Sequence, residues 1–65
     1  MARFQVGDKV ERIGSLVPEY MKHGVVVRVM PNEHSDLFTA YEVSFGSQMI
    51  AIFYETQLRP ANDSN

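Results

Sequence analysis

Histidines and carboxylates are the side chains in this sequence that could perform acid–base or metal chemistry. His34 lies in one polar stretch with Glu33 and Asp36, and a metal ion could share these three side chains as ligands. Metal sites need ligands held in place by a supporting shell of hydrogen bonds. The spacing of these three residues in a loop does not indicate that they are held in place in this way. We therefore interpret the stretch as a solvated loop and predict neither a metal site nor a cofactor.

The other histidine, His23, gives no catalytic pattern either. A general base needs a partner side chain and a pocket, and the spacing places no serine or aspartate near it. We expect Asp8 to cap a turn, Glu42 to face water and Glu55 to tether the last turn. A domain of this size is also too small to enclose a substrate. The sequence thus predicts a protein that is not an enzyme.

Length and composition point to one small domain. The chain has 65 residues and no cysteine, so neither a disulfide nor a thiolate-held zinc can stabilise it. A domain of this length buries only about 60% of the surface that its unfolded chain exposes. Asp8 interrupts any signal peptide, and no apolar run approaches the roughly 20 residues of a membrane helix. We therefore expect a cytoplasmic protein.

The charge balance disfavours nucleic acid as the partner. Six basic and eight acidic residues give a formal net charge of −2, whereas clustered Lys and Arg supply most of the affinity of double-strand binders. The basic residues are scattered singly along the chain: Arg3, Lys9, Arg12, Lys22, Arg28 and Arg59.

The hydrophobic pattern is that of β-strands, with Gly and Pro about every ten residues. No stretch has helical periodicity over three turns. Pro18 is expected to begin a single helical turn, and residues 55–57 a one-turn 3₁₀ connection. Strands are expected over residues 9–13, 23–30, 39–45, 48–54 and 58–59. The fold class is therefore all-β, with one five-stranded barrel domain over residues 1–59 and a disordered tail over residues 60–65.

The dipeptide Gly46-Ser47 predicts how the third and fourth strands pair. Glycine at the first central position is typical of a two-residue type II′ hairpin turn, which places Phe45 opposite Gln48. Since a one-residue slip inverts a strand, this register decides the faces. It predicts that Ile50, Ile52 and Tyr54 face the core and that Met49, Ala51 and Phe53 face outward.

The second strand is rich in valine, and its period of two puts Val25, Val27 and Val29 on one face. In the first strand, Val10 lies between charged neighbours and is expected to point inward. The predicted core contains Val10, Val27, Val29, Val43, Ile50 and Ile52, with Leu58 closing the barrel.

Four short motifs carry a resemblance to a known fold family. They are Phe4-Gln5-Val6-Gly7-Asp8-Lys9-Val10, His23-Gly24-Val25-Val26, Tyr41-Glu42-Val43-Ser44-Phe45 and Glu55-Thr56-Gln57-Leu58. Over residues 4–59 the chain resembles the SH3-like barrels of the KOW and Tudor type, in which a glycine opens the second strand, as Gly24 does here. The resemblance implies a small five-stranded SH3-like barrel that acts as a binding module. KOW modules that bind RNA tend to be basic, and this chain is acidic.

The leading hypothesis is a protein-interaction module that binds a protein or peptide through an apolar and aromatic surface. Tyr20, Met49 and Phe53 are the predicted anchors. Lys22 and Arg28 are the predicted polar contacts at the rim.

The alternative hypothesis is a KOW-like RNA-binding module, as the resemblance implies. Tyr20 would stack a base. The phosphate contacts would come from Lys9, Arg12, Lys22 and Arg28.

Self-association is a further expectation. An apolar patch of Met49, Ala51 and Phe53 outside the core is a feature that monomers avoid, and strand edges beside it can pair with a second copy. We therefore predict a homodimer, formed by edge pairing, by packing of the apolar faces, or by strand exchange through the loops over residues 14–22 and 31–37. In the opposing interpretation, Leu16 or Tyr20 from the long loop covers Phe53 and the chain stays a monomer.

Overall fold

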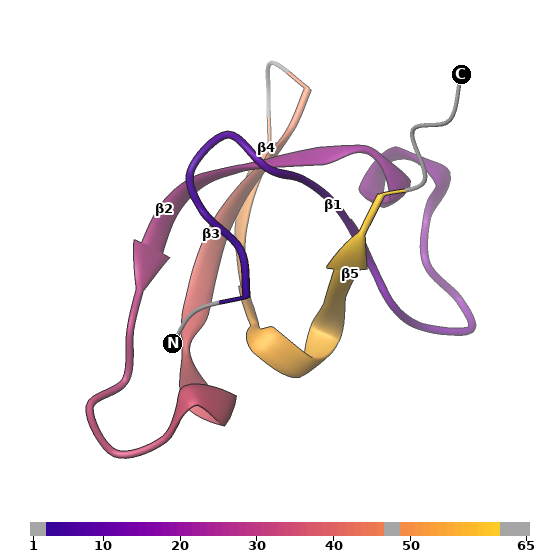
Figure 1. Cartoon of the computed structure of the whole chain (residues 1–65). Helices are drawn as coiled ribbons and strands as arrows, with labels where there is room; N and C mark the ends of the chain where they lie inside the picture. The colour runs from indigo at the N-terminus through magenta and orange to yellow at the C-terminus, as the bar shows by residue number, and fades with distance from the viewer. Residues whose placement is uncertain (1–2, 47–48, 62–65) are drawn as a thin grey trace.

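The structure of the chain is a computed structural model, and it describes residues 3–46 and 49–61 (Figure 1). The described residues form strands and single-turn 3₁₀ helices, with no α-helix among them. In chain order the elements are β1 (Lys9–Arg12), η1 (Glu19–Lys22), β2 (Gly24–Met30), η2 (Asp36–Phe38), β3 (Ala40–Phe45), β4 (Met49–Tyr54), η3 (Glu55–Gln57) and β5 (Leu58–Pro60). Over the same residues, no helix has the length and apolar character that crossing a membrane requires.

The five strands form one antiparallel sheet in the order β4-β3-β2-β1-β5. Consecutive strands pair from β1 to β4, and β5 returns to pair with β1. Figure 1 shows the sheet strongly bent, with η3 joining the two edge strands β4 and β5. The predicted class, an all-β domain with five antiparallel strands, is confirmed.

The core draws on every strand and on the segment before β1. Its buried hydrophobic side chains are Phe4, Val10, Val26, Tyr41, Val43, Phe45, Phe53 and Leu58. The predictions for Val10, Val43 and Leu58 are confirmed, since all three are fully buried.

A β-bulge divides β2. Val26 pairs with Val43 and Arg28 with Glu42, so Val27 is an extra residue with no partner across the strand pair. An inserted residue changes which side chains face inward on its two sides.

The bulge decides which valines of β2 are buried. Val26 is fully buried, while Val25 and Val27 are exposed. Beyond the bulge, Val29 packs against the core. The prediction for Val29 is thus confirmed, and the prediction that Val27 lies in the core is wrong, because a strict period of two cannot account for the bulge.

The hairpin between β3 and β4 also differs from its prediction. Phe45 pairs with Met49, so three residues separate the strands. Gly46 has the positive φ expected of it, +78°, but the predicted pairing of Phe45 with Gln48 is wrong. The conformations of Ser47 and Gln48 lie outside the described residues.

This one-residue difference reverses β4. Phe53 is buried and Ala51 packs against the core, whereas Ile50 and Ile52 each expose 59% of their surface and Tyr54 exposes 54%. The prediction that Ile50, Ile52 and Tyr54 face the core is therefore wrong, and so are the outward positions predicted for Ala51 and Phe53.

The positions of the short 3₁₀ turns agree better with the predictions from the sequence. The helical turn after Pro18 is η1, and the predicted connection over residues 55–57 is η3. The sheet continues beyond residue 59, since Pro60 pairs with Val10 and the Ala61 N–H donates to the Lys9 carbonyl at 3.0 Å. Residues 60 and 61, which were predicted to belong to a disordered tail, thus extend the pairing with β1, and the disorder predicted for residues 62–65 falls outside the described residues.

Candidate binding surface

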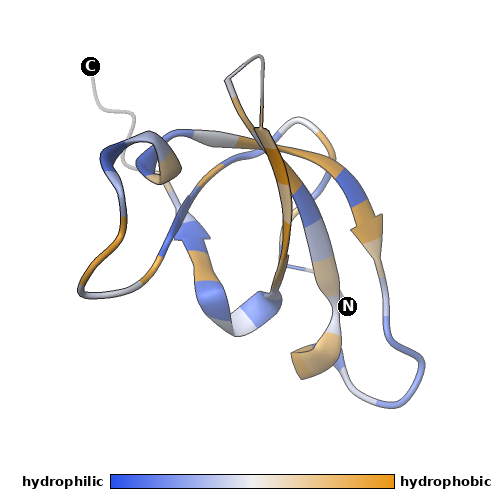
Figure 2. Cartoon of the chain, turned by 180° about the vertical axis from the view of Figure 1, so that it is seen from behind, coloured by the Kyte–Doolittle hydropathy of each residue, from blue (hydrophilic) through white to orange (hydrophobic). Residues whose placement is uncertain are grey.

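A row of apolar side chains runs along the outer face of β4. Ile50, Ile52 and Tyr54 alternate with residues that face the core, so they lie in line on one face. We call these three residues the β4 stripe. The strand is hydrophobic along most of its length (Figure 2).

An exposed ring of η2 extends the β4 stripe at one end. The Phe38 ring packs edge-to-face on Tyr54, with 6.4 Å between the ring centroids, and both rings remain exposed. Edge-to-face geometry favours the contact, which fixes η2 beside the end of β4.

The outward residues of β3 beside the β4 stripe are small or polar. Ser44 lies opposite Ile50, and Glu42 lies opposite Ile52. Glu42 also lies opposite Arg28 of β2, a cross-strand arrangement of opposite charges. The apolar surface is therefore concentrated at the edge of the sheet.

The backbone of β4 alternates between groups bonded to β3 and groups turned away from it. The Glu55 N–H donates to the Thr39 carbonyl at 2.9 Å, which marks this pair as a hydrogen-bonded one. Hydrogen-bonded and non-hydrogen-bonded pairs alternate in an antiparallel ladder. Counting back in steps of two, the pairs made by Phe53, Ala51 and Met49 are also hydrogen-bonded.

It follows that the N–H and carbonyl groups of Ile50, Ile52 and Tyr54 point away from β3, toward the edge of the sheet. The Tyr54 N–H agrees with this direction, because it donates to Gln57 Oε1 at 2.9 Å. β4 is an edge strand of the sheet, and no described strand takes up the groups of Ile50 and Ile52. These two residues therefore present both an exposed side chain and open backbone groups.

Among the predicted anchors, Phe53 has a different place from the one expected. It is only 8% exposed and packs edge-to-face on Phe45 at 5.9 Å between centroids. The Arg12 guanidinium lies 5.5 Å above the Phe53 ring. A core residue of this kind cannot serve as a surface anchor, so its predicted position on the binding surface is corrected.

The remaining predicted residues lie on three elements. Tyr20, in η1, is exposed and packs edge-to-face on Phe45 at 6.1 Å. Leu16 does not cover Phe53, since it is 93% exposed. Met49 is exposed at the start of β4.

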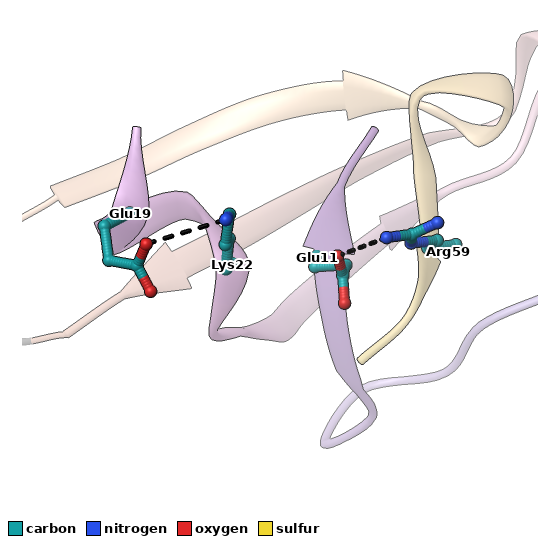
Figure 3. Close-up of polar contacts among 4 residues, drawn as sticks. All are labelled: Glu11, Glu19, Lys22 and Arg59. Carbon is teal, nitrogen blue, oxygen red and sulfur yellow. Dashed lines mark hydrogen bonds and ion pairs between the residues drawn. The ribbon is translucent and has the colours of Figure 1, made fainter. Parts of the chain in front are cut away.

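The two predicted rim residues are also separate. Arg28 lies on β2 opposite Glu42. Lys22 lies at the end of η1, where its Nζ is 3.6 Å from Glu19 Oε1 (Figure 3). The structure thus does not gather the predicted anchors and rim into one surface.

A polar cavity of about 450 Å³ lies beside β1 and β5, and three basic residues line it. Arg59 is paired with Glu11 at 2.9 Å, and Lys22 is paired with Glu19 (Figure 3). Arg12 differs from both, because its Nε is buried and has no hydrogen-bond partner in the described structure. An unsatisfied guanidinium nitrogen is costly, and its burial keeps this atom from direct contact with an anion in the cavity.

Tyr41 and Glu55 form a buried polar pair. The Tyr41 hydroxyl donates to a carboxylate oxygen of Glu55, and accepts the N–H groups of Arg3 at 3.1 Å and Phe4 at 3.4 Å. Burial raises the pKa of Tyr41, and the hydrogen bond to Glu55 raises it further. Glu55 therefore tethers η3, as predicted, and the pair has a structural role.

The two histidines lie on different segments of the described chain. The His34 N–H donates to Asn32 Oδ1 at 2.8 Å within the loop. His23 lines a small cavity of about 180 Å³ together with Lys9 and the start of β2. No group of three or more potential metal ligands is found among the residues that the structure describes.

The comparisons with known proteins identify no relative: no family model, no curated protein and no solved structure matches the chain. The candidate surface therefore rests on the geometry of this chain. Sequence reasoning missed the β4 stripe because residues 49–54 contain no charge, and either alternate set of side chains could have faced the core. The signal that could have found it is the length of this uncharged run.

Proposed function

We propose that this chain is a non-catalytic protein-binding module built on a small SH3-like barrel, and that it docks a protein partner through the β4 stripe. The observation that carries the proposal is the exposure of Ile50 and Ile52, side by side on the outer face of an edge strand. Single exposed aliphatic side chains are common on protein surfaces, whereas a contiguous exposed apolar patch marks an interaction site.

The SH3-like barrel is supported by the order of the strands and by the bend of the sheet. β1 pairs with both β2 and β5, and a 3₁₀ turn leads into β5. Gly24 opens β2 at a crowded point, where an added Cβ would lie 2.5 Å from Val43 Cγ1. The position of Gly24 agrees with the glycine that opens the second strand in KOW and Tudor barrels, which the chain resembles.

A capture experiment tests the docking proposal. The chain is immobilised and exposed to extract from its native host, beside an Ile52→Lys variant and a Leu16→Lys variant. Both substitutions place the same charge at an exposed apolar position, so Leu16→Lys is the matched control. We expect proteins that wild type and Leu16→Lys retain and Ile52→Lys loses. Retention that is equal in all three would contradict the proposal.

A second candidate function is the binding of single-stranded RNA, and the three basic residues that line the polar cavity, Arg12, Lys22 and Arg59, favour it. Tyr20, exposed on η1, would be the stacking ring. A titration with RNA at two salt concentrations, with wild type and Arg12→Ala, tests it. Binding that weakens steeply with salt and with the substitution would support it. No binding at low salt would remove it.

A further inference from the structure

β4 differs from the protected edge strands that are usual in soluble proteins. Such edges are short, or carry charged side chains, proline or a bulge that prevents another strand from pairing with them. β4 has six residues, none of them charged and none of them proline, and its pairs with β3 run without a register shift. It is therefore a regular strand with one side already paired and the other side able to pair.

We propose that the occupant of this edge is a second copy of the same chain, paired antiparallel through β4. The inference rests on the proposed function and identifies the partner of the β4 stripe. An antiparallel pairing of a strand with its own copy is self-complementary about a two-fold axis, so one surface supplies both halves of the interface.

The open backbone groups determine the register of the pair. The Tyr54 N–H is already used by Gln57, which leaves Ile50 and Ile52 with open donors and acceptors. The register that uses both residues in both chains sets Ile50 opposite Ile52 of the second copy. Ala51 then lies on the two-fold axis, opposite Ala51 of the second copy, in a non-hydrogen-bonded pair.

This register also brings the two β4 stripes together on one face of a continuous sheet. At roughly 100 Å² of exposed surface for each side chain, the stripe can contribute at most about 300 Å² per copy, because side chains that lie side by side in a sheet cover only each other's flanks. The paired backbone and the exposed Met49 add to that area. The two stripes alone therefore account for at most about 600 Å² over both partners, below the roughly 1,200 Å² at which specific stable interfaces begin, so the dimer should be weak and dissociate on dilution.

Charge does not oppose the approach of the two strands. β4 carries no ionisable group other than the Tyr54 phenol, and the nearest outward acid in register, Glu42, lies on β3 opposite a basic residue of β2. Two copies therefore meet without like charges directly opposed, which would destabilise the pair.

Cross-linking at Ala51 tests the register. The Cα atoms of a non-hydrogen-bonded antiparallel pair are about 4.5 Å apart, within the range that a disulfide spans. The chain has no cysteine, so an Ala51→Cys variant carries a single thiol. Under mild oxidation at about 100 μM, Ala51→Cys should form a covalent dimer faster than Leu16→Cys, although Leu16 is far more exposed. Slower cross-linking at the less exposed Ala51 position would contradict the register.

Molar mass measured by light scattering tests the dimer itself. At about 100 μM, wild type and Leu16→Lys should be dimers and Ile52→Lys a monomer, each with cooperative thermal unfolding as evidence of folding. A wild-type monomer would overturn the inference, as would a dimer that Ile52→Lys leaves intact. If wild type is a monomer but captures proteins that Ile52→Lys does not, self-pairing alone would be overturned and the proposed function would stand.

Discussion

The two edges of the sheet are built in different ways. β5 has three residues, and its last, Pro60, has no N–H to offer. Its middle residue, Arg59, is held by an ion pair with Glu11 on β1. β4 is twice as long, is uncharged, and turns the backbone groups of Ile50 and Ile52 to the outside.

The difference indicates which edge is available to a partner. A short strand that ends in proline cannot be extended by another chain, whereas a regular apolar strand is a template for pairing. The same chain protects one edge and leaves the other open. We infer that the open edge, β4, is covered by a partner and not by a feature of its own sequence.

The largest expected effect is a loss of stability on truncating a core side chain of β5, compared with an outward side chain of β4. Leu58→Ala should cost about 2–5 kcal/mol of unfolding free energy, because Leu58 is fully buried. Ile52→Ala should cost less than about 1 kcal/mol at concentrations where the chain is monomeric, since surface positions contribute little. Urea unfolding of both variants at low concentration measures the difference, and equal losses would contradict the observed register of β4.

Proline substitutions along β4 test the direction of its backbone groups. Ala51→Pro should destabilise the domain by about 1–3 kcal/mol or more, because it deletes a donor to β3 and leaves the Val43 carbonyl unpaired. Ile50→Pro should leave the fold intact, because the N–H that it deletes points to the open edge, and should abolish the dimer. Circular dichroism melts and light scattering report both effects. If Ile50→Pro unfolds the domain and Ala51→Pro does not, the N–H of Ile50 must bond to β3, which would contradict the assigned directions of the β4 backbone groups.

The hairpin that holds β4 on the sheet gives a smaller effect. Gly46 has φ +78° with no atom near the position of an added Cβ, so a substitution meets backbone strain alone. Gly46→Val should destabilise by about 1–2 kcal/mol or more. Thermal unfolding checks this, and an unchanged melting temperature would show that the loop relaxes without cost.

The smallest expected effect is at the protected edge. Arg59→Ala removes the ion pair with Glu11, which is partly exposed and is expected to contribute about 0.2–1 kcal/mol. The loss should shrink as salt is added. A loss of unfolding free energy that exceeds this range and does not change with salt would show that Arg59 stabilises β5 by more than its ion pair.

The sequence predicted the positions of the strands and turns because alternation and punctuation were clear there. Val10 lies between charged residues, and β3 alternates strictly, so their inward faces could be assigned. Pro18 and residues 55–57 marked the 3₁₀ turns by local chemistry.

The sequence could not assign the faces where both sets of side chains are apolar. In β4 the register depended on the length of one loop, and the positive φ at Gly46 was found with a loop one residue longer than predicted. In β2 the bulge at Val27 lies within a run of valines that shows no break in pattern. The predicted anchor Phe53 and the missed β4 stripe are two results of the same one-residue difference.

Amide hydrogen exchange along β4 tests the central claim most directly. The claim is that β4 is open in a single copy and paired in the dimer. At protein concentrations well above the dissociation constant of the dimer, the amides of Ile50 and Ile52 should be protected from exchange. On dilution their exchange should accelerate, while Ala51 and Phe53, bonded to β3, keep their protection. Rapid exchange at Ile50 and Ile52 that is independent of protein concentration would contradict the claim.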